Sequence, residues 1–351
     1  MLPGPRPPSL EGVTNRSRPL VIAHRGASGY RPEHTRAAYE LAFTLGADAV
    51  EPDIVACKDG VLVLRHENEI SGTTDVAAHP EFAHLRTTKV IDGERLTGWF
   101  TEDFTWAELS TLRSRERLPG VRTGSATFDD RWGILRLSDL LSIIDEQSGR
   151  LGRELIMVAE IKHATHFASV GLPLHELFAA EVAGWATPAN LIVESFEQTV
   201  LGEIRALGVP GRYIYLVDRS GSAADLVARF GPKALPYSAQ VTPAGLARLA
   251  SAVDGISVDK RMLLDASSPS GTTDLVDRAH AAGLLVFTWT LRAENRFLAR
   301  HLRCGSAARD FGEWRSEFEL ILGTGVDGVF ADQPDLVLSL FDPPEGVSPS
   351  P

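Results

Sequence analysis

The sequence has little cysteine and no long apolar run. Its 351 residues include two cysteines, Cys57 and Cys304. A disulfide framework is therefore excluded, although a single bridge between the two remains open. No stretch approaches the roughly 18 apolar residues that a membrane-spanning helix needs, so we expect no stable membrane insertion. With 44% hydrophobic residues the chain is nevertheless long enough to bury a full core without covalent staples.

Positive charge is also in short supply. The chain has 35 Lys and Arg residues against 46 Asp and Glu residues, which gives a net charge of −11 at pH 7. General nucleic-acid binding is disfavoured, because proteins of that class usually carry a basic face. An anionic ligand would need a local positive charge to offset the field of the protein, and a bound divalent cation would supply one. The sequence carries no signal from which the oligomeric state can be predicted.

The two ends of the chain are poor in apolar residues. Residues 1–18 are rich in Pro, Arg and Ser, and residues 342–351 read DPPEGVSPSP. Both segments are predicted to be disordered. The first lacks the apolar region of a secretory signal, so we expect a cytoplasmic protein if this is the natural start. Secretion is the alternative if the start was trimmed.

Between the ends, short apolar runs rich in β-branched residues alternate with helical patterns. Near-continuous apolar strands that alternate with helices indicate a parallel sheet covered on its faces. Eight such units fit a closed TIM-type (β/α)8 barrel better than an open sheet. The eight candidate strands are Leu20–His24, Ala49–Val55, Leu155–Ile161, Leu191–Phe196, Tyr213–Val217, Gly255–Val258, Leu284–Thr290 and Gly325–Ala331.

Two long segments interrupt this alternation. Residues 67–137 separate the second and third strands, and residues 292–312 follow the seventh. Loops of this length are uncommon unless they are functional or carry structure of their own. In a parallel barrel both would rise from the C-terminal face, where active sites lie. The clearest helical patterns cover Thr35–Leu45, Leu174–Gly184, Gln198–Leu207, Thr272–Ala282 and Trp314–Leu322.

The first strand runs directly into a polar motif, His24-Arg25-Gly26. A His and an Arg at the C-terminal end of a barrel strand are placed at the barrel mouth. Gly26 allows the backbone to turn tightly there, and Arg25 can bind two oxygens of a phosphate. The alternative is a structural pair of loop residues.

The second strand ends in two carboxylates, Glu51 and Asp53, which share one face because strand side chains alternate. Such neighbours repel unless something positive lies between them, and an oxygen-preferring cation is the simplest compensation. A protonated carboxylate or a pair with Arg is the alternative. Asp59-Gly60 then predicts a hairpin turn that brings His66 back toward this strand end. His66 is a second acid/base candidate, with a structural role as the alternative.

The third strand supplies Glu160 and Lys162, again on one face. Glu160 could complete the coordination of a cation, and Lys162 could pair with it or with a phosphate. His163 and His166 lie past the strand end and are predicted to be structural or exposed.

Later strand ends carry fewer polar groups. Phe196 and Trp289 could line a pocket, although a Trp in a barrel is as often part of the core. Asp332, after the last strand, could cap the following helix as readily as it could bind a ligand. The remaining polar groups at strand ends are Glu194, Ser195, Asp259 and Lys260.

Taken together, five segments resemble the glycerophosphodiester phosphodiesterase family. In chain order they are HRGASGYRPEHT, VEPDIVACKDGVLVLRHE, AEIK, FTWT and GVDGVFADQPD. Each is weak alone, but the ordered set extends from residue 20 to about residue 340. The resemblance implies a TIM barrel over residues 19–341 with a small insertion after the second strand, which matches residues 67–137.

The resemblance also implies roles for individual residues. His24 and His66 are similar to the family's general acid/base pair, and Glu51, Asp53 and Glu160 to its metal ligands. The ion would be Mg²⁺ or Ca²⁺, with Mn²⁺ tolerated. Residues that resemble the phosphate- and substrate-facing positions are Arg25, Lys162, Trp289 and, as a pocket wall, Phe196. Two positions depart from the family pattern: His34 replaces an Asn, and Glu67 replaces the Asp after the second His.

The implied activity is hydrolysis of glycerophosphodiesters, such as glycerophosphocholine and glycerophosphoethanolamine, to glycerol 3-phosphate and an alcohol through a cyclic phosphate. A phospholipase-D-like enzyme that acts on sphingomyelin or lysophospholipids is the first alternative. A barrel that has lost catalysis and only binds a ligand is the second.

Overall fold

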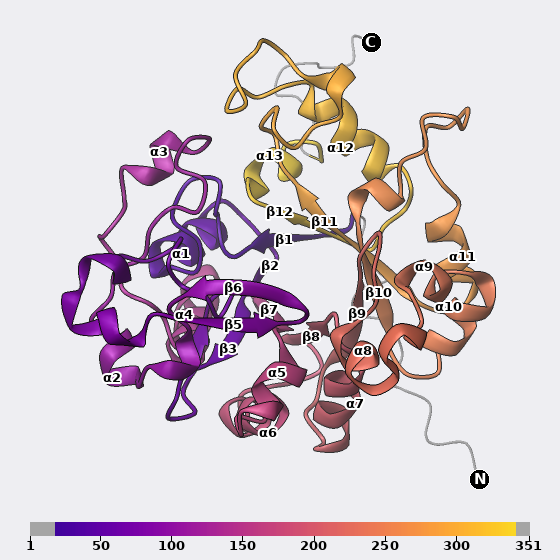
Figure 1. Ribbon diagram of the computed structural model, residues 1–351. Helices are drawn as coiled ribbons and strands as arrows, with labels where there is room; N and C mark the ends of the chain where they lie inside the picture. Colours follow the sequence, from indigo (N-terminus) through magenta and orange to yellow (C-terminus); the bar gives the residue numbers. More distant parts are fainter. Residues whose placement is uncertain (1–17, 342–351) are drawn as a thin grey trace.

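The computed structural model describes residues 18–341 (Figure 1). The predicted N-terminal arm, apart from Arg18, and the predicted tail at 342–351 lie outside these residues. Cys57 and Cys304 are both free, so the bridge left open by the sequence does not form. Within the described part of the chain, no helix has the length and apolar character needed to cross a bilayer.

A ten-stranded sheet closes on itself through pairing of β2 with β7. β2 and β3 are two parts of one barrel strand, separated at Pro52, and β4 (Leu62–Leu64) is added antiparallel to β3. The remaining pairings are parallel, so the predicted eight-stranded (β/α)8 barrel is confirmed. Its strands are β1 (Leu20–His24), β2 (Ala49–Glu51) with β3 (Asp53–Ala56), β7 (Ile156–Ile161), β8 (Leu191–Ser195), β9 (Arg212–Val217), β10 (Gly255–Asp259), β11 (Leu285–Leu291) and β12 (Gly328–Ala331).

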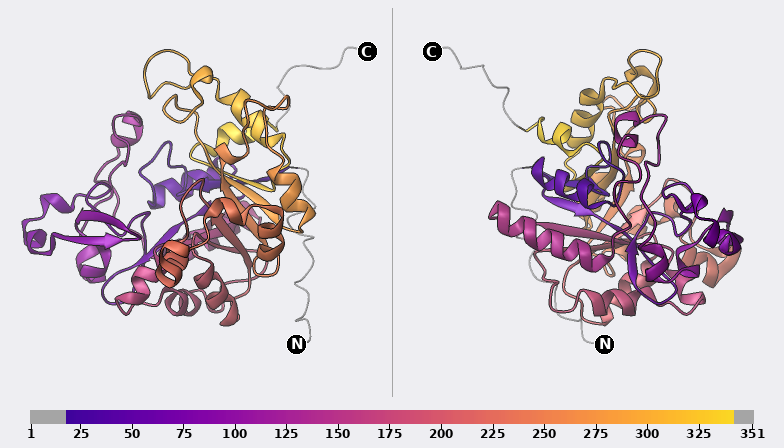
Figure 2. Two further views of the ribbon diagram at one scale, coloured as in Figure 1. Left: turned by 45° about the vertical axis from the view of Figure 1, so that its right-hand side comes forward. Right: turned by 90° about the vertical axis from the view of Figure 1, so that its left-hand side faces the viewer.

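Helices follow the strands and cover the outside of the barrel (Figures 1 and 2). The five predicted helices are present; four of them are shorter than predicted, and α12 has the predicted bounds. The helix α4 is not among the predicted helices, because its first residue, Leu137, is the last residue of the predicted insertion. The helices are α1 (Arg36–Thr44), α4 (Leu137–Leu151), α5 (Ala164–Ser169), α6 (Leu174–Glu181), α7 (Gln198–Ala206), α8 (Ala224–Phe230), α9 (Tyr237–Gln240), α10 (Pro243–Leu249), α11 (Leu275–Ala281), α12 (Trp314–Leu322) and α13 (Pro334–Leu338).

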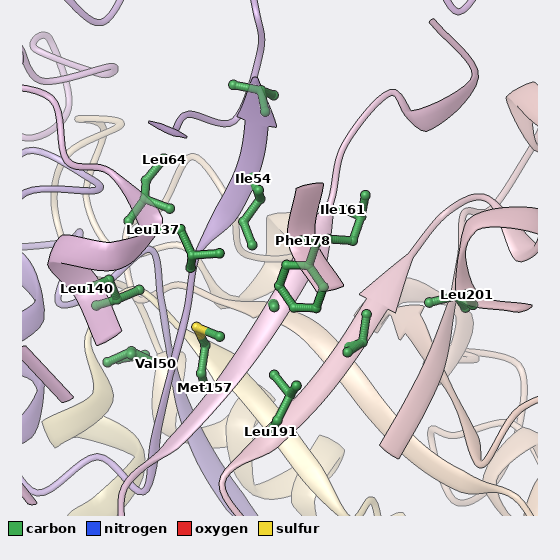
Figure 3. Close-up of a cluster of buried hydrophobic side chains, with 14 of the residues drawn as sticks. Val50, Ile54, Leu64, Leu137, Leu140, Met157, Ile161, Phe178, Leu191 and Leu201 are labelled. Carbon is green, nitrogen blue, oxygen red and sulfur yellow. The ribbon is translucent and has the colours of Figure 1, made fainter. Parts of the chain in front are cut away.

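The apolar residues form two clusters separated by the barrel wall. Between wall and helices, Val50 and Met157 from the strands pack near Leu140 of α4 and Phe178 of α6 (Figure 3). A smaller cluster of ten buried residues fills the barrel itself. It consists of Leu20, Ile22, Ala49, Ile156, Val158, Ile192, Ile214, Leu285, Phe287 and Phe330. Because side chains alternate along a strand, the next inward position after these residues lies at the barrel mouth.

The segment between β4 and α4 forms a lobe beside the barrel mouth (Figure 2). It carries an antiparallel hairpin of β5 (Thr87–Ile91) and β6 (Glu94–Gly98), and two short helices, α2 (Trp106–Leu109) and α3 (Thr123–Ala126).

Two histidines of the β7 end hold this lobe: His163 Nδ1 lies 2.6 Å from Asp92 Oδ2, and His166 Nε2 lies 2.8 Å from Glu102 Oε1. The sequence predicted that both histidines are structural or exposed, and these contacts support a structural role.

Candidate active site

His24 is the last residue of β1 and occupies the inward position after Leu20 and Ile22. The chain then turns sharply, with Arg25 at φ 60° and Gly26 at φ 83°. A Cβ atom on Gly26 would lie 2.6 Å from the backbone carbon of Ala38, so only glycine fits this turn. The turn places the His24 ring and the Arg25 guanidinium together at the mouth of the barrel.

Three carboxylates meet at the ends of β2, β3 and β7. One oxygen from each of Glu51, Asp53 and Glu160 lies within 4.8 Å of the others, and all three residues are buried. Glu51 Oε1 and Asp53 Oδ1 are buried without a hydrogen-bond partner among residues 18–341. Buried acceptors without a donor are costly, and a hard cation would satisfy them. The predicted set of metal-ligating residues is therefore brought together and fits a divalent ion.

Positive side chains offset part of this negative charge. Arg25 Nε lies 3.0 Å from Asp53 Oδ2, and Lys162 Nζ lies 2.8 Å from Glu160 Oε1. Burial opposes ionisation of Asp53, but Arg25 and its other neighbours hold the pKa of Asp53 well below its usual range. Burial and the adjacent Asp53 charge raise the pKa of Glu51 well above its usual range. The cluster is thus incompletely neutralised by the protein itself.

Each imidazole has a carboxylate partner on Nδ1. His24 Nδ1 lies 2.6 Å from Asp332 Oδ1, and His66 Nδ1 lies 2.5 Å from Glu67 Oε1. Burial, followed by the charge of Arg25, lowers the pKa of His24 to about 4 and that of His66 to about 3. Both rings are therefore neutral at pH 7 and can accept a proton on Nε2.

A cavity of about 320 Å³ lies between these groups. Eight of the nine predicted site residues line it, and the ninth, Asp53, is fully buried against Arg25. Phe196 and Trp289 form an aromatic wall, with ring centroids 5.7 Å apart at an angle of 81°. Glu194, opposite Glu160 on β8, adds a fourth carboxylate, and burial raises its pKa well above the usual range.

The sequence left the role of Asp332 open. Its carboxylate makes no helix cap but binds His24 and two arginines, Arg122 from the insertion and Arg292 after β11. Arg292 Nε lies 2.6 Å from Asp332 Oδ2. The position of Asp332 at the end of the last strand did indicate a candidate site residue. Nothing in the sequence identified either arginine, because each lies in an irregular segment.

The two residues that depart from the family pattern both contact residues of the site. His34 Nε2 lies 2.9 Å from Asp53 Oδ2, and His34 Nδ1 lies 2.8 Å from the Tyr39 hydroxyl. Glu67 reaches His66 and also binds Arg117 Nη1 at 2.7 Å. Both substituted side chains therefore still support site residues.

The model of the glycerophosphoryl diester phosphodiesterase family matches residues 24–336. Glycerophosphodiester phosphodiesterase GDPD6 of Arabidopsis thaliana is 29% identical over 335 residues, which is 90% of this chain and 84% of that protein.

Among solved structures, a glycerophosphoryl diester phosphodiesterase from Silicibacter pomeroyi superimposes with a TM-score of 0.63 at 21% identity, over 95% of this chain and 97% of the other. A phosphodiesterase from Oleispira antarctica in complex with the product sn-glycerol-3-phosphate superimposes with a TM-score of 0.60 at 20% identity, over 93% of this chain and 98% of the other. At these identities the structures support the shared fold.

Proposed function

Since the chain belongs to the glycerophosphoryl diester phosphodiesterase family, we propose that the 320 Å³ cavity is the site where it hydrolyses its small-molecule substrates. The enzyme converts glycerophosphodiesters to glycerol 3-phosphate and an alcohol. Glycerophosphocholine and glycerophosphoethanolamine are the substrates proposed here. One observation carries the assignment of the site: a cluster of three buried carboxylates, two of which line the cavity, lies beside a cavity that two neutral imidazoles also line.

Glu51, Asp53 and Glu160 would hold one divalent cation, Mg²⁺ or Ca²⁺, with Mn²⁺ tolerated. When bound, the ion would offset phosphate charge and make a neighbouring hydroxyl more acidic. Arg25 and Lys162 contribute the positive charge that the chain itself supplies to the phosphate. The wall of Phe196 and Trp289 excludes water from one side of the substrate.

His24 and His66 would transfer the protons. One neutral ring accepts the proton of the glycerol 2-hydroxyl as its oxygen bonds to phosphorus. An anionic phosphodiester beside the other ring raises its pKa, so that ring takes up a proton from solvent when the substrate binds. As an imidazolium it then protonates the departing alcohol oxygen. This step breaks the phosphorus–oxygen bond to the alcohol and leaves a cyclic phosphate. Water then bonds to phosphorus and breaks its bond to the glycerol 2-oxygen, with the proton transfers reversed, which restores the 2-hydroxyl and gives glycerol 3-phosphate.

A panel of glycerophosphodiesters tests this function in an assay coupled to glycerol 3-phosphate formation. We expect turnover of glycerophosphocholine and glycerophosphoethanolamine, loss of that turnover with EDTA, and recovery when Mg²⁺, Ca²⁺ or Mn²⁺ is restored separately. Faster release of choline from lysophosphatidylcholine than from glycerophosphocholine, measured by a choline assay, would instead favour the phospholipase-D-like alternative. Full activity in EDTA would rule out the proposed ion.

Asp332 would act as a positioning residue, because its carboxylate fixes the proton of His24 on Nδ1 and leaves Nε2 free for proton transfer. We expect Asp332→Asn to lower kcat by about 10- to 100-fold, the value of one charge-assisted hydrogen bond, with little change in KM. Loss of the carboxylate also leaves Arg292 without its carboxylate partner near the ring, whereas Arg122 keeps its ion pair with Glu294. The pKa of His24 measured by NMR should therefore fall further.

Asp335→Asn is the matched control for this change. Asp335 lies three residues later and accepts a hydrogen bond from the Tyr30 hydroxyl at 2.9 Å, outside the cavity. It should leave both kcat and the titration of His24 unchanged. Equal losses in the two variants would indicate a structural effect at the end of β12 and would contradict the positioning role.

A further inference from the structure

A second cavity, of about 690 Å³, adjoins the catalytic one and shares four of its lining residues. The shared residues are Trp289, Thr290, Arg292 and Phe297. The remaining wall comes from segments that follow β9, β10 and β11, so this cavity opens on the same face of the barrel. A group attached to a phosphate in the catalytic cavity could therefore extend directly into it.

The charge of this second cavity is opposite to that of the protein as a whole, and we call it the basic cavity. Six cationic side chains line it against two carboxylates, in a chain whose net charge is −11. The cations are Arg219, Lys260, Arg261, Arg292, Arg296 and Arg303, and the carboxylates are Asp259 and Glu317. A concentration of one sign of charge in a concave site attracts ligands of the other sign.

Three of the six cations are already paired: Lys260 with Glu317, Arg261 with Asp259, and Arg292 with Asp332.

Arg219, Arg296 and Arg303 lie within ion-pair distance of no carboxylate among residues 18–341. Arg303 Nε donates to the Leu298 carbonyl at 3.1 Å, and Arg296 lies 5.9 Å from the centre of the Phe297 ring. The guanidinium groups of these three arginines are therefore available to an anionic ligand.

A third cavity, of about 660 Å³, also adjoins the catalytic cavity and carries the opposite charge to the basic cavity. It shares Glu160, Lys162 and Phe196 with the catalytic cavity, and its further wall includes Asp92, Glu94, Glu197 and Asp218. The scissile phosphate would thus lie between an acidic and a basic cavity. The glycerol arm of the substrate offers hydroxyl donors, which carboxylates accept, whereas an anionic alcohol arm matches only the basic side.

We propose that the basic cavity binds the alcohol arm of the substrate and selects alcohols that carry a further phosphate, such as polyol phosphates. The proposal rests on the proposed function, because it extends the same phosphodiester site. Arginine pairs phosphate oxygens with two parallel hydrogen bonds, which makes it suited to this selection. Leu264, Leu298 and Leu302 of the cavity wall would contact the carbon framework of the polyol.

Two substrates that differ by one phosphate test the proposal: glycerophosphoinositol and glycerophosphoinositol 4-phosphate. We expect the wild-type enzyme to show at least about tenfold higher kcat/KM for the phosphorylated substrate, a preference that weakens as ionic strength rises. The triple variant Arg219→Gln, Arg296→Gln, Arg303→Gln should lose this preference, because its kcat/KM should fall at least about tenfold more for the phosphorylated substrate than for glycerophosphoinositol.

The control variant is Arg95→Gln, Arg229→Gln, Arg248→Gln. It removes the same charge from exposed positions that do not line the basic cavity, and it should keep the preference. Equal activity of wild type on the two substrates, or loss of preference in both variants, would overturn the proposal. The proposal would also be overturned if inorganic phosphate inhibited the wild type, the cavity variant abolished this inhibition, and the wild type showed no substrate preference. The site would then bind free phosphate. Absence of all glycerophosphodiester turnover would instead contradict the proposed function itself.

Discussion

Replacing His24 by alanine is expected to lower kcat by about 10²- to 10⁴-fold, because one of the two proton transfers loses its donor or acceptor. The ring lies at the mouth of the barrel, and its only charged partner in the described chain is Asp332. No hydrogen bond or ion pair joins the ring to any of the three carboxylates. Affinity for the divalent ion, measured by isothermal titration calorimetry, should therefore remain near the wild-type value.

His280→Ala is a suitable control for the removal of an imidazole. His280 lies on α11 and binds Asp327 at 2.9 Å, away from the catalytic cavity. Its variant should keep full turnover. Strong residual activity in His24→Ala, together with normal folding, would refute the proposed role of His24 in catalysis.

Replacing Glu51 by glutamine should have opposite effects on the ion-free and ion-bound protein. Glu51 is almost fully buried next to Asp53, so without an ion the two charges repel each other at the cost of folding stability. A glutamine side chain could still accept the 2.9 Å hydrogen bond from the Arg25 backbone amide. We expect the variant to melt a few degrees higher in EDTA, since about 1 kcal/mol corresponds to a shift of a few degrees.

The same variant should bind the ion more than about 100-fold more weakly, because it loses a charged ligand rather than a group that only supports one. Ion at 100 times its dissociation constant stabilises a wild-type protein by about 2.7 kcal/mol, and this increment should nearly disappear. Thermal melting with and without each ion measures both effects.

Glu116→Gln is the control that distinguishes removal of a buried charge from loss of a metal ligand. Glu116 is also a buried carboxylate with a pKa raised by burial, but it lies outside the carboxylate cluster. Its variant should keep the full response to the ion. An undiminished ion response in Glu51→Gln would remove Glu51 from the proposed set of ligands.

Local periodicity explains why so much of the fold could be predicted. Each barrel strand is a run of apolar residues with turn signals at its ends, and the eight predicted runs match the observed strands closely. The second run differs because Pro52, which has no amide hydrogen to donate, divides it into β2 and β3. The Asp59-Gly60 turn predicted the β3–β4 hairpin, which is confirmed by their antiparallel pairing.

The same periodicity placed most of the candidate site. His24 continues the inward series of Leu20 and Ile22, and Glu160 continues that of Ile156 and Val158. Parallel strands bring such positions together at one end of a barrel without further information. The roles of these residues remain proposals, but their convergence on one cavity was already determined by the sequence.

Only the tertiary structure determined which further groups lie around the cavity where these side chains meet. His24 and Asp332 are separated by 308 positions, and Arg122 and Asp332 by 210. No local pattern links residues so far apart, because their contact depends on closure of the barrel and on the path of two irregular segments. The opposite charges of the two neighbouring cavities have the same origin.

The sequence by itself determined the barrel and the side chains at its strand ends, because strands and helices have regular patterns that can be predicted from neighbouring residues. The packing of the long loops, which have no such pattern, determined which groups those side chains contact.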